Sequence, residues 1–470
     1  MTATTSLQQT FDRCRSSVTS LRSEKLAARK KRLRDLRRWI KDNRSRIQHA
    51  VYADLGKPAP EVDATEIFPV LSEIRLALDS LDDWAAPAKV DAPLYMAGTR
   101  SWIYKEPRGA CLIISPWNYP FNLAAGPLVP ALAAGNSVIL KPSEMTPNTS
   151  QLIAEMCAAV FDPAIVSVCE GGVEVSETLL SFPFDHIFFT GSPTVGKIVM
   201  KAAADHLSSV TLELGGKSPA IVSSSANIRE TARRIAVAKL INCGQTCIAP
   251  DYILVHRENA DPLIEALIAE AGNMFGRDGG LIESPDYGRV VSSRHFERLS
   301  TLVEQTVAAG AKVAWDGKHN GQQRFFHPVV LRDVPLDSPV MQEEIFGPIL
   351  PVLSYDTPEE AISIVNARPK PLALYLFGFS SADRRPFLTE ISSGTVCIND
   401  CAIQFLHNGL PFGGVNHSGF GKSHGYHGFI AFSHEKAVLR QKSGFTAVQT
   451  FYPPYSRITR RLMDWFLRMF

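Results

Sequence analysis

One cysteine lies in a sequence context that suits a nucleophile. Cys247 ends the stretch Asn-Cys-Gly-Gln-Thr-Cys, and residues with helical apolar spacing run into that stretch. We expect Gly244 to break this helix and to expose the thiol at a boundary between two lobes, where backbone N–H groups favour the thiolate. Most free cysteines are small buried hydrophobic residues, so this interpretation depends on the residues around it.

A carboxylate inside an apolar strand is the second chemical candidate. Glu213 lies in the stretch Thr-Leu-Glu-Leu-Gly-Gly-Lys. Burial would raise the pKa of this carboxyl group and suit it to act as a general base near neutral pH. The glycines that follow favour close approach of a ligand or of another backbone segment. The alternative is a glutamate at a strand edge that faces solvent.

An amide side chain supplies a third candidate. Asn118 lies in Ser-Pro-Trp-Asn-Tyr-Pro, just beyond an apolar run that ends at Ile114. Ligands of open α/β sheets bind at the carboxyl ends of the strands, and an amide there can donate to a developing oxyanion. The alternative is a turn asparagine between two prolines.

Further stretches could hold a nucleotide. Lys141 and Glu144 follow a predicted strand and suit the two hydroxyl groups of a ribose; the alternative is a surface turn with a helix cap. The stretch Gly-Ser-Pro-Thr-Val-Gly-Lys from Gly191 follows a strand and opens a helix, which is a phosphate-binding geometry. It falls short of the P-loop pattern because Ile198 stands where that pattern needs a hydroxyl for Mg²⁺. A P-loop nucleotide hydrolase is therefore a competing function of a different class.

Two later stretches are predicted to form either turns or loops that contact a ligand. One is Glu-Glu-Ile-Phe-Gly-Pro from Glu343, and the other is the glycine-rich segment 410–422.

Alternating strands and helices must position these residues. From about residue 110, short apolar runs alternate with helical stretches, which predicts parallel sheets covered on both faces. The first series places strands at 111–114, 138–140, 166–169, 187–189 and 210–214, with helices at 128–134, 150–160 and 195–206. Later series place strands at 220–222, 252–255, 326–331, 349–353, 372–379 and 395–398, with helices at 230–241 and 262–274. The sequence thus predicts an α/β protein with two lobes.

Composition excludes several classes of protein. Lys and Arg number 49 against 47 Asp and Glu, and a net charge of +2 provides no global field for nucleic acid. The 8 cysteines form no repeating framework, which argues against a disulfide-stapled secreted domain. No apolar run is long enough to span a bilayer, and the N-terminus lacks an apolar signal region. We expect a cytoplasmic protein with no nucleic-acid partner and no metal site.

Residues 22–46 are crowded with Lys and Arg. Leu26, Leu33, Leu36 and Ile40 recur there at helical spacing, which predicts one amphipathic helix with a core-facing stripe and a solvated basic face. The alternative is a nucleic-acid or lipid patch.

Seven ordered stretches resemble the motifs of the aldehyde dehydrogenase superfamily. They are Pro-Trp-Asn, Lys-Pro-Ser-Glu, Phe-Thr-Gly-Ser, Leu-Glu-Leu-Gly-Gly-Lys, Gly-Gln-Thr-Cys, Glu-Glu-Ile-Phe-Gly-Pro and Pro-Phe-Gly-Gly. The resemblance covers about residues 20–455. The short N-terminus, the stretch Cys-Ile-Ala-Pro-Asp-Tyr from Cys247 and the stretch Tyr-Pro-Pro-Tyr from Tyr452 are similar to the class 3 branch, which includes fatty-aldehyde and aromatic-aldehyde enzymes.

This resemblance implies a role for each matching residue. Cys247 would be the nucleophile, Asn118 and the backbone N–H of Cys247 the oxyanion hole, and Glu213 the base that activates the hydrolytic water. The expected contacts to NAD or NADP are Lys141 and Glu144 at the adenosine ribose, Gly191, Ser192 and Gly196 along the pyrophosphate, Glu344 at the nicotinamide ribose, Phe346 near the ring, and Ile114, Trp117 and Leu214 beside them. Glu144 disfavours a 2′-phosphate by charge, but the choice between the two cofactors stays open.

The resemblance also implies an architecture and a reaction. A Rossmann-like parallel-sheet cofactor domain would span 1–93 and 111–212, and an α/β catalytic domain 213–410. A small β bridging element, at 94–110 and 429–446, would join a homodimer. The implied reaction is NAD(P)-dependent oxidation of an aldehyde to a carboxylic acid. The apolar C-terminal tail favours a medium- or long-chain aliphatic aldehyde, and an aromatic aldehyde is the alternative.

Three residues depart from the pattern of these relatives or add to it. Pro193 stands where many have Thr or Ala, and Gln404 where class 3 relatives often have His. Cys243 is a second thiol near Cys247; it is expected either as a packed residue or as the partner of a regulatory disulfide.

The last segment, 454–470, is expected to form an amphipathic helix. Its apolar face comprises Ile458, Leu462, Trp465, Phe466 and Met469, flanked by Arg457, Arg460, Arg461 and Arg468. Three interpretations are open: peripheral contact with a membrane surface, a cover over the substrate mouth as in fatty-aldehyde relatives, and docking on a partner subunit. A basic membrane-associated scaffold without activity is the third functional class.

Overall fold

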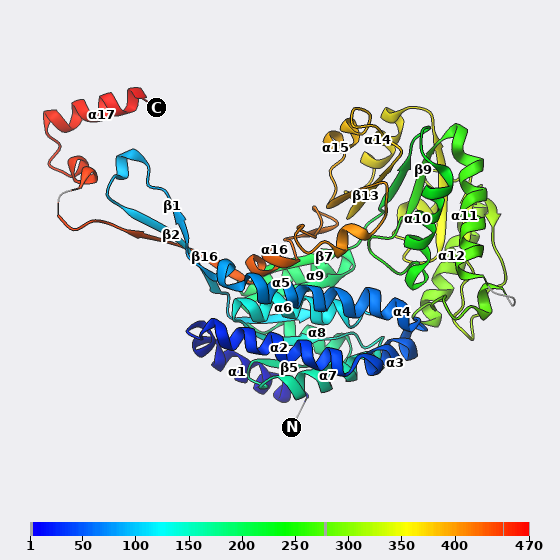
Figure 1. The fold of residues 1–470 in the computed structure, drawn as a ribbon, viewed down its shortest axis with the longest axis horizontal. Coiled ribbons are helices and arrows are strands. Elements are labelled where there is room, and N and C mark those ends of the chain that lie inside the picture. The colour runs from blue at the N-terminus through cyan, green and yellow to red at the C-terminus, as the bar shows by residue number, and fades with distance from the viewer. Residues whose placement is uncertain (1–2, 277–279, 445, 470) are drawn as a thin grey trace.

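Three β-sheets organise the chain. The computed structural model describes residues 3–276, 280–444 and 446–469, so residues 1, 2 and 470 of the expected terminal segments lie outside the described residues. Figure 1 shows two α/β lobes side by side and an arm that projects from the first lobe and carries the C-terminus at its tip.

The first sheet has six strands in the order β15-β7-β6-β3-β4-β5. All are parallel except β15, which runs antiparallel to β7. Leu112 lies opposite both Ile139 and Ile187, so the centre of the sheet is apolar across three strands. The strands are β3 (Ala110–Ile114), β4 (Ser137–Lys141), β5 (Val166–Val168), β6 (His186–Gly191), β7 (Ser209–Leu214) and β15 (Gly419–Phe420).

Helices cover both faces of this sheet because successive side chains of a strand point to opposite sides. Cys111 and Ile113 pack among the helices of one face, and Leu112 and Ile114 among those of the other. The first face holds α2 (Leu26–Asp42), α3 (Arg44–Leu55), α5 (Phe68–Ala85), α6 (Asn122–Ala134), α7 (Pro147–Val160) and α16 (Gly425–Ala431). The second holds α1 (Ala3–Arg22), α8 (Val173–Leu180) and α9 (Pro193–Asp205). A short helix α4 (Ala59–Val62) and a π-helical turn η1 (Asp63–Ile67) lead into α5.

The second sheet has seven strands in the order β10-β11-β12-β9-β8-β13-β14, and only the β10–β11 pair is antiparallel. The strands are β8 (Pro219–Val222), β9 (Tyr252–His256), β10 (Lys312–Trp315), β11 (Val329–Arg332), β12 (Ile349–Tyr355), β13 (Ala373–Phe377) and β14 (Thr395–Ile398). Its faces are covered by α10 (Ile228–Leu240) and α11 (Ala260–Phe275) on one side and by α12 (Ser293–Ala308), α14 (Pro358–Asn366) and α15 (Arg385–Glu390) on the other. Short helical turns complete this lobe: η3 (Ile241–Gly244), η4 (Arg257–Asn259), η5 (Leu281–Glu283), α13 (Pro339–Gln342) and η6 (Ile403–Leu406).

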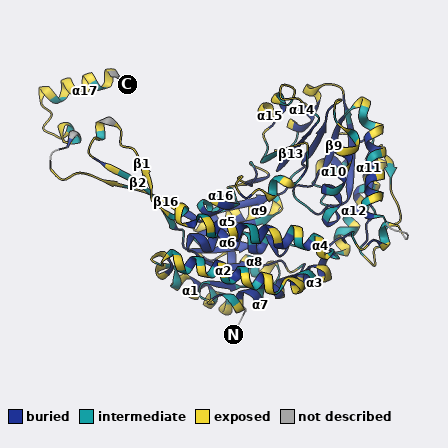
Figure 2. Cartoon of the chain, in the orientation of Figure 1, coloured by how far each residue is buried: buried dark blue, intermediate teal, exposed yellow. Residues whose placement is uncertain are grey.

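The arm is a three-stranded antiparallel sheet. It consists of β1 (Ala88–Val90), β2 (Arg100–Pro107) and β16 (Ser433–Arg440), and β16 pairs with β2 over its full length. The turns η2 (Leu94–Met96) and η7 (Ala447–Phe451) and the helix α17 (Arg457–Met469) lie at its tip. Figure 2 shows that the arm and α17 are largely exposed, whereas the strands of both lobes are buried.

The predicted alternation of strands and helices is confirmed in both lobes, and two local differences are informative. The strand expected at 326–331 begins only at Val329, because Pro328 has no N–H to donate to a ladder. The basic segment forms two helices rather than one, since the backbone leaves the helical region at Asn43. Its expected stripe is correct: Leu33, Leu36 and Ile40 are fully buried. No helix in the described segments is both long and apolar enough to cross a bilayer.

Candidate active site

Four strand ends of the first sheet meet at one edge. Since β3, β4, β6 and β7 are parallel, their last residues lie together. Ile114 is opposite Lys141, and Gly191 is opposite Leu214. Four of the residues expected to contact a cofactor therefore converge, although they are up to 100 positions apart in sequence.

The N-terminus of α9 opens at the same edge. Ser192 caps this helix, and its hydroxyl accepts from the backbone N–H of Val195 at 3.3 Å. A Cβ at Gly196 would lie 2.8 Å from Cδ2 of Leu214, so glycine lets the first turn of α9 pack closely on β7. Free N–H groups at a helix N-terminus suit a pyrophosphate.

Lys141 and Glu144 form one unit beside this turn. The Lys141 ammonium donates to the Glu144 carboxylate at 2.7 Å, and the lysine is buried while the glutamate is partly exposed. This arrangement leaves carboxylate oxygen accessible for a ribose hydroxyl.

Glu344 has a buried carboxyl oxygen without a partner in the described part of the chain. Its Oε1 is buried without a hydrogen-bond partner among the described residues. Burial and the neighbouring Asp251 raise the pKa of this carboxyl to about 8, against the N–H of Gly216. A Cβ at Gly215 would overlap the Glu344 carboxylate, so the carboxylate keeps this position because residue 215 is glycine. A buried orphan acceptor of this kind fits the hydroxyls of a nicotinamide ribose.

Phe346 of the second lobe and Trp117 of the first lobe form an aromatic pair. Their rings meet edge to face with centroids 5.2 Å apart, and Trp117 also packs on His295 at 5.1 Å. Phe346 adopts a left-handed backbone conformation with φ of 49°. The pair offers an apolar surface on which a planar ring can rest.

A buried ion pair that was not assigned from the sequence holds the loop of Glu344. The Lys217 ammonium contacts Asp251 and donates to the carbonyls of Val340 and Glu343 at 2.8 and 2.9 Å. Asp251 in turn accepts from the N–H of Ile345 at 2.9 Å. Lys217 and Asp251 both belong to stretches already quoted as motifs, but only the structure shows that they fix the two sides of Glu344.

The turn before Cys247 is strained and tightly enclosed. The helix α10 ends at Leu240, earlier than the expected break at Gly244, and Asn242, Cys243 and Gly244 have φ values of 52°, 54° and 73°. A Cβ at Gly244 would lie 2.3 Å from the carbonyl oxygen of Gly347. The nucleophile turn therefore packs directly against the loop that carries Glu344 and Phe346.

Asn118 lies beside this turn. Its Nδ2 donates to the Gln245 carbonyl at 3.0 Å, and its own carbonyl accepts from Asn242 Nδ2 at 2.7 Å and from Lys57 at 3.3 Å. Lys57 is fully buried and paired with Glu66 at 2.7 Å. Since an amide nitrogen carries two hydrogens, one remains for a reacting oxygen.

Glu213 lies on β7, between Thr190 of β6 and Gly419 of β15. Neither carboxyl oxygen has a hydrogen-bond partner among the described residues. Burial raises the pKa of this carboxyl to about 8, and Ser423 and Lys422 oppose the shift only in part. The prediction of a buried strand glutamate is correct, and the alternative of a solvent-facing edge is not what the structure shows.

Cys247 borders two cavities. A larger one of about 550 Å³ is lined mainly by apolar side chains, including Val237, Ile241 and Phe405. A smaller one of about 60 Å³ is shared with Glu213. The thiol is therefore reachable from both sides, as its expected exposure requires.

The surroundings of the Cys247 thiol favour its protonated form. Burial, Glu344 and Glu213 raise its pKa, whereas the backbone N–H groups of Cys247 and Ile248 lower it. The expected N–H groups are present, but burial outweighs them, so the thiol must pass its proton to a base when it attacks.

The three departing residues have structural explanations. Pro193 occupies the first turn of α9, where proline is tolerated. Gln404 donates to Tyr375 and Thr395 and does not line the larger cavity. Cys243 is a free, fully buried thiol 3.4 Å from the Tyr287 hydroxyl, which supports the packed-residue interpretation. Among the residues that the structure describes, no group of three or more His, Cys, Asp or Glu could hold a metal ion.

Comparison with known proteins agrees with this geometry. The family model "Aldehyde dehydrogenase family" matches residues 2–438. The chain is 43% identical over 453 residues to the 4,4'-diaponeurosporen-aldehyde dehydrogenase of Staphylococcus aureus, covering 96% of each. It is 41% identical to aldehyde dehydrogenase family 3 member A2 of Rattus norvegicus, covering 96% of this chain and 92% of that one.

Solved structures share the fold. A substrate-bound S. aureus AldH superposes with a TM-score of 0.93 at 42% identity, over 98% of this chain and 99% of that chain. A Mycobacterium tuberculosis aldehyde dehydrogenase complexed with NAD+ gives 0.86 at 27% identity, over 95% and 92%. A glyceraldehyde-3-phosphate dehydrogenase of Methanocaldococcus jannaschii complexed with NADP gives 0.84 at 25% identity, over 94% and 95%.

The chain belongs to the aldehyde dehydrogenase family. It is an oxidoreductase that oxidises aldehydes with NAD or NADP, and the expected α/β class and the resemblance to class 3 are confirmed. This assignment favours aldehyde oxidation over the nucleotide-hydrolase and inactive-scaffold alternatives.

The raised pKa of Glu213 predicts a pH-dependent cost to stability. Between the ordinary value of 4.5 and about 8, the folded protein holds a proton that the unfolded chain releases. The contribution of Glu213 to stability is therefore present below pH 4.5 and lost as pH rises through about 8. Glu213→Gln cannot ionise, so its unfolding free energy should exceed that of the wild type by about 2–4 kcal/mol at pH 9 and by much less at pH 5, measured by denaturant unfolding.

The matched control is Glu155→Gln, since Glu155 is exposed on α7 and pairs with Arg46. Its difference from the wild type should not change with pH in this way. An equal difference for Glu213→Gln at pH 5 and pH 9 would show that this carboxyl does not titrate in an enclosed site.

Proposed function

We propose that Cys247, Asn118 and Glu213 oxidise an aldehyde through a thiohemiacetal and a thioester on Cys247. The observation that carries the proposal is the place of Cys247 between two cavities, one apolar and large enough for a substrate, the other holding the Glu213 carboxyl. The larger volume lies within the roughly 300–1,000 Å³ of small-ligand sites.

The first step is attack of the sulfur on the aldehyde carbon. The thiol proton passes to the Glu344 carboxylate, which together with Glu213 raises the pKa of the thiol. The carbonyl oxygen becomes an alkoxide, which accepts from the free Nδ2 hydrogen of Asn118 and from the N–H of Cys247.

NAD or NADP, when bound, would supply the acceptor for the hydride of the thiohemiacetal carbon. Glu344 and Phe346, held by Lys217 and Asp251, would keep the nicotinamide side of the cofactor at the sulfur, while Lys141, Glu144 and the Ser192 turn would hold the adenosine and pyrophosphate. The remaining thioester is attacked by water, whose proton goes to Glu213, and Cys247 leaves as a thiolate when the C–S bond breaks.

Two substitutions test these roles. Cys247→Ala should abolish aldehyde oxidation but leave cofactor binding intact in a titration, whereas Cys157→Ala, which removes a buried thiol of the first lobe, should keep activity. Glu213→Gln should stall at the thioester: one equivalent of reduced cofactor forms rapidly and later turnover is about 10²–10⁴-fold slower. Wild-type turnover in Glu213→Gln would show that another group is the base.

For the substrate, the apolar lining favours a medium- or long-chain aliphatic aldehyde. Val237, Ile241, Ile403 and Leu406 line the larger cavity. A relative named for 4,4'-diaponeurosporen-aldehyde supports an apolar substrate. Tyr119 and Phe405 also line it, so an aromatic aldehyde is the second candidate.

A series of straight-chain aldehydes, assayed with NAD and with NADP, separates the two candidates. Since each buried methylene contributes about 0.8 kcal/mol, kcat/KM should rise by about fourfold per added carbon until the cavity is filled. A flat series, with benzaldehyde-type substrates preferred, would favour the aromatic alternative. The ratio between cofactors shows whether Glu144 rejects a 2′-phosphate.

We further propose the division of the chain given by the resemblance, with the first sheet as the cofactor domain, the second as the catalytic domain and the arm as the element that joins a homodimer. In the arm sheet, the outer edges of β1 and β16 pair with no further strand among the described residues. Tyr104 and Leu439 are exposed on it, which suits burial by a second copy. Two strands of the first sheet extend beyond the range expected for the cofactor domain. The strand β7 runs to Leu214, past residue 212, and β15 joins the sheet from residues 419–420.

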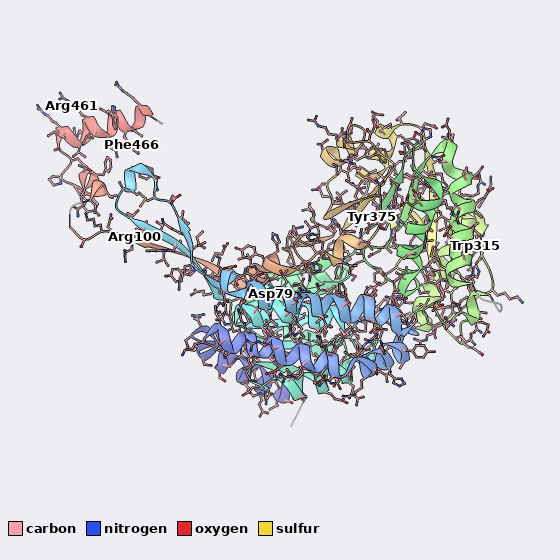
Figure 3. The ribbon with its side chains drawn as sticks, in the orientation of Figure 1. Asp79, Arg100, Trp315, Tyr375, Arg461 and Phe466 are labelled. Atoms are coloured by element: carbon pink, nitrogen blue, oxygen red, sulfur yellow. The ribbon has the colours of Figure 1, made fainter. Side chains whose placement is uncertain are left out.

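The helix α17 is proposed as a peripheral contact with an anionic membrane surface. It lies at the tip of the arm and does not cover the larger cavity of its own chain. Figure 3 shows Phe466 on the side that faces the arm, where its ring is 5.7 Å from that of Tyr95, and Arg461 on the opposite side. Ile458 and Trp465 stay largely exposed beside the arginines, which suits a headgroup layer. The side chain of Met469, the last residue of the expected face, lies outside the described structure.

Truncation after Tyr455 tests this contact. The full chain should sediment with liposomes that contain anionic lipid, less so at high salt, and the truncated chain should stay in the supernatant. Native mass is measured in parallel, because an unchanged dimer shows that the arm is intact. Unchanged sedimentation after truncation would refute the membrane contact, and loss of the dimer would instead favour docking on a partner subunit.

A further inference from the structure

A second buried carboxyl group lies behind the active site and has no cationic partner. Glu73 of α5 is 6% exposed, and both of its oxygens accept from the N–H of Gly425, at 3.2 and 3.0 Å. No ion pair is formed by Glu73 within the described part of the chain. A buried acid without a counter-charge is costly and is often found where a group must change its protonation state.

The smaller cavity connects Glu73 to the chemistry. Glu73, Glu213 and Cys247 all line it. Its volume of about 60 Å³ is large enough for several water molecules, since each water needs roughly 10–15 Å³. The two carboxyl groups and the thiol that line this chamber thus come from α5, β7 and the turn at Cys247, three segments far apart in sequence.

Polar atoms without partners also line this chamber. Nδ2 of Asn408 and Nδ1 of His424 are buried and make no hydrogen bond to the described residues, and the same is true of both Glu213 oxygens. Asn408 is only 9% exposed. Burial lowers the pKa of His424 to about 4, so its ring is neutral at physiological pH. The rest of the lining is mostly apolar, so these unpartnered buried donors and acceptors mark the places in the chamber where ordered water would be held.

Hydrolysis of the thioester releases a proton, and this proton must leave the active site. When water attacks the thioester, a C–O bond forms, one O–H bond of the water breaks, and the proton resides on Glu213. The acyl group on Cys247 then fills the larger cavity, so the chamber on the other side remains as the route away from Glu213. Burial raises the pKa of Glu73 to about 7 and that of Glu213 to about 8, so a proton can pass between them without a large free-energy step.

We propose that Glu73 receives, through water in this chamber, the proton that Glu213 takes from the hydrolytic water, and releases it to solvent. This inference rests on the proposed role of Glu213. Glu73 acts through Glu213 and does not touch the substrate, so it is a positioning residue for the proton and not a catalytic one.

The test is Glu73→Gln, which keeps the shape of the side chain and an acceptor for Gly425. The rapid burst of reduced cofactor should be unchanged, because the steps up to the thioester do not use Glu73. Steady-state kcat should fall by about tenfold, its solvent isotope effect should increase, and a small buffer such as imidazole should restore part of the rate. The matched control is Glu270→Gln: this glutamate of α11 is similarly buried, at 8% exposure, but does not line the chamber, so kcat should stay at the wild-type value.

Asn408→Leu provides a second variant if Glu73→Gln fails to fold. It removes a polar wall of the chamber from a different segment and should give the same pattern, a full burst with slower turnover. Wild-type kcat in both variants, or a fall in burst and turnover together without buffer rescue, would overturn the proposal. The two proposals can be contradicted separately. A Glu213→Gln protein without a burst would contradict the proposed function. If Glu213→Gln stalls at the thioester but Glu73→Gln turns over at the wild-type rate, the relay alone is contradicted.

Discussion

The site depends on a backbone contact with no room for a side chain. Gly244, in the turn before Cys247, meets the Gly347 carbonyl so closely that any Cβ would overlap it. The nucleophile comes from the end of α10, and the Glu344–Phe346 loop comes from a segment about 100 residues later, so this contact sets the distance between thiol and cofactor loop. The Lys217–Asp251 pair fixes the loop from its other side. Together they make the two halves of the reaction one rigid unit.

The protonation states of three buried groups determine the electrostatics of the active site. Burial raises the pKa of Cys247, Glu213 and Glu344 together, so adding one negative charge makes each neighbour harder to ionise. Such coupled groups exchange protons as a set. The thiol can therefore remain protected in its neutral form until a substrate and a cofactor change this balance.

Much of this arrangement was predictable from local sequence. The strand ends near Ile114, Lys141, Gly191 and Leu214 converge because parallel strands share an edge, and the alternation of apolar runs gives that topology. The stretches around Cys247 and Glu213 also carry recognisable motifs. Their chemistry depends on residue types that are unusual in buried strands and turns, and such residues are visible without coordinates.

The rest depends on contacts between distant segments, which no periodicity encodes. The Lys57–Glu66 pair supports the carbonyl of Asn118, yet Lys57 lies in the loop after α3 and Glu66 in the turn η1, and neither belongs to a motif. Glu73 reads as one polar position on an ordinary amphipathic helix until α16 and β7 enclose it. The resting place of α17 on the arm is equally non-local, because it depends on Tyr95, over 350 residues earlier in the chain.

Two strand pairings bear on how the enzyme is made. Among the described residues, the outer edge of β7, which holds Glu213, is closed by β15 through Gly419, and the arm strand β2 has β16 as its second neighbour beside β1. Both closing strands are synthesised last, more than 200 residues after β7, so a ribosome-bound chain has an open first sheet until translation is nearly finished. Such long-range closure slows folding. A chain that ends before β15 therefore leaves the strand that carries Glu213 without its partner at that edge.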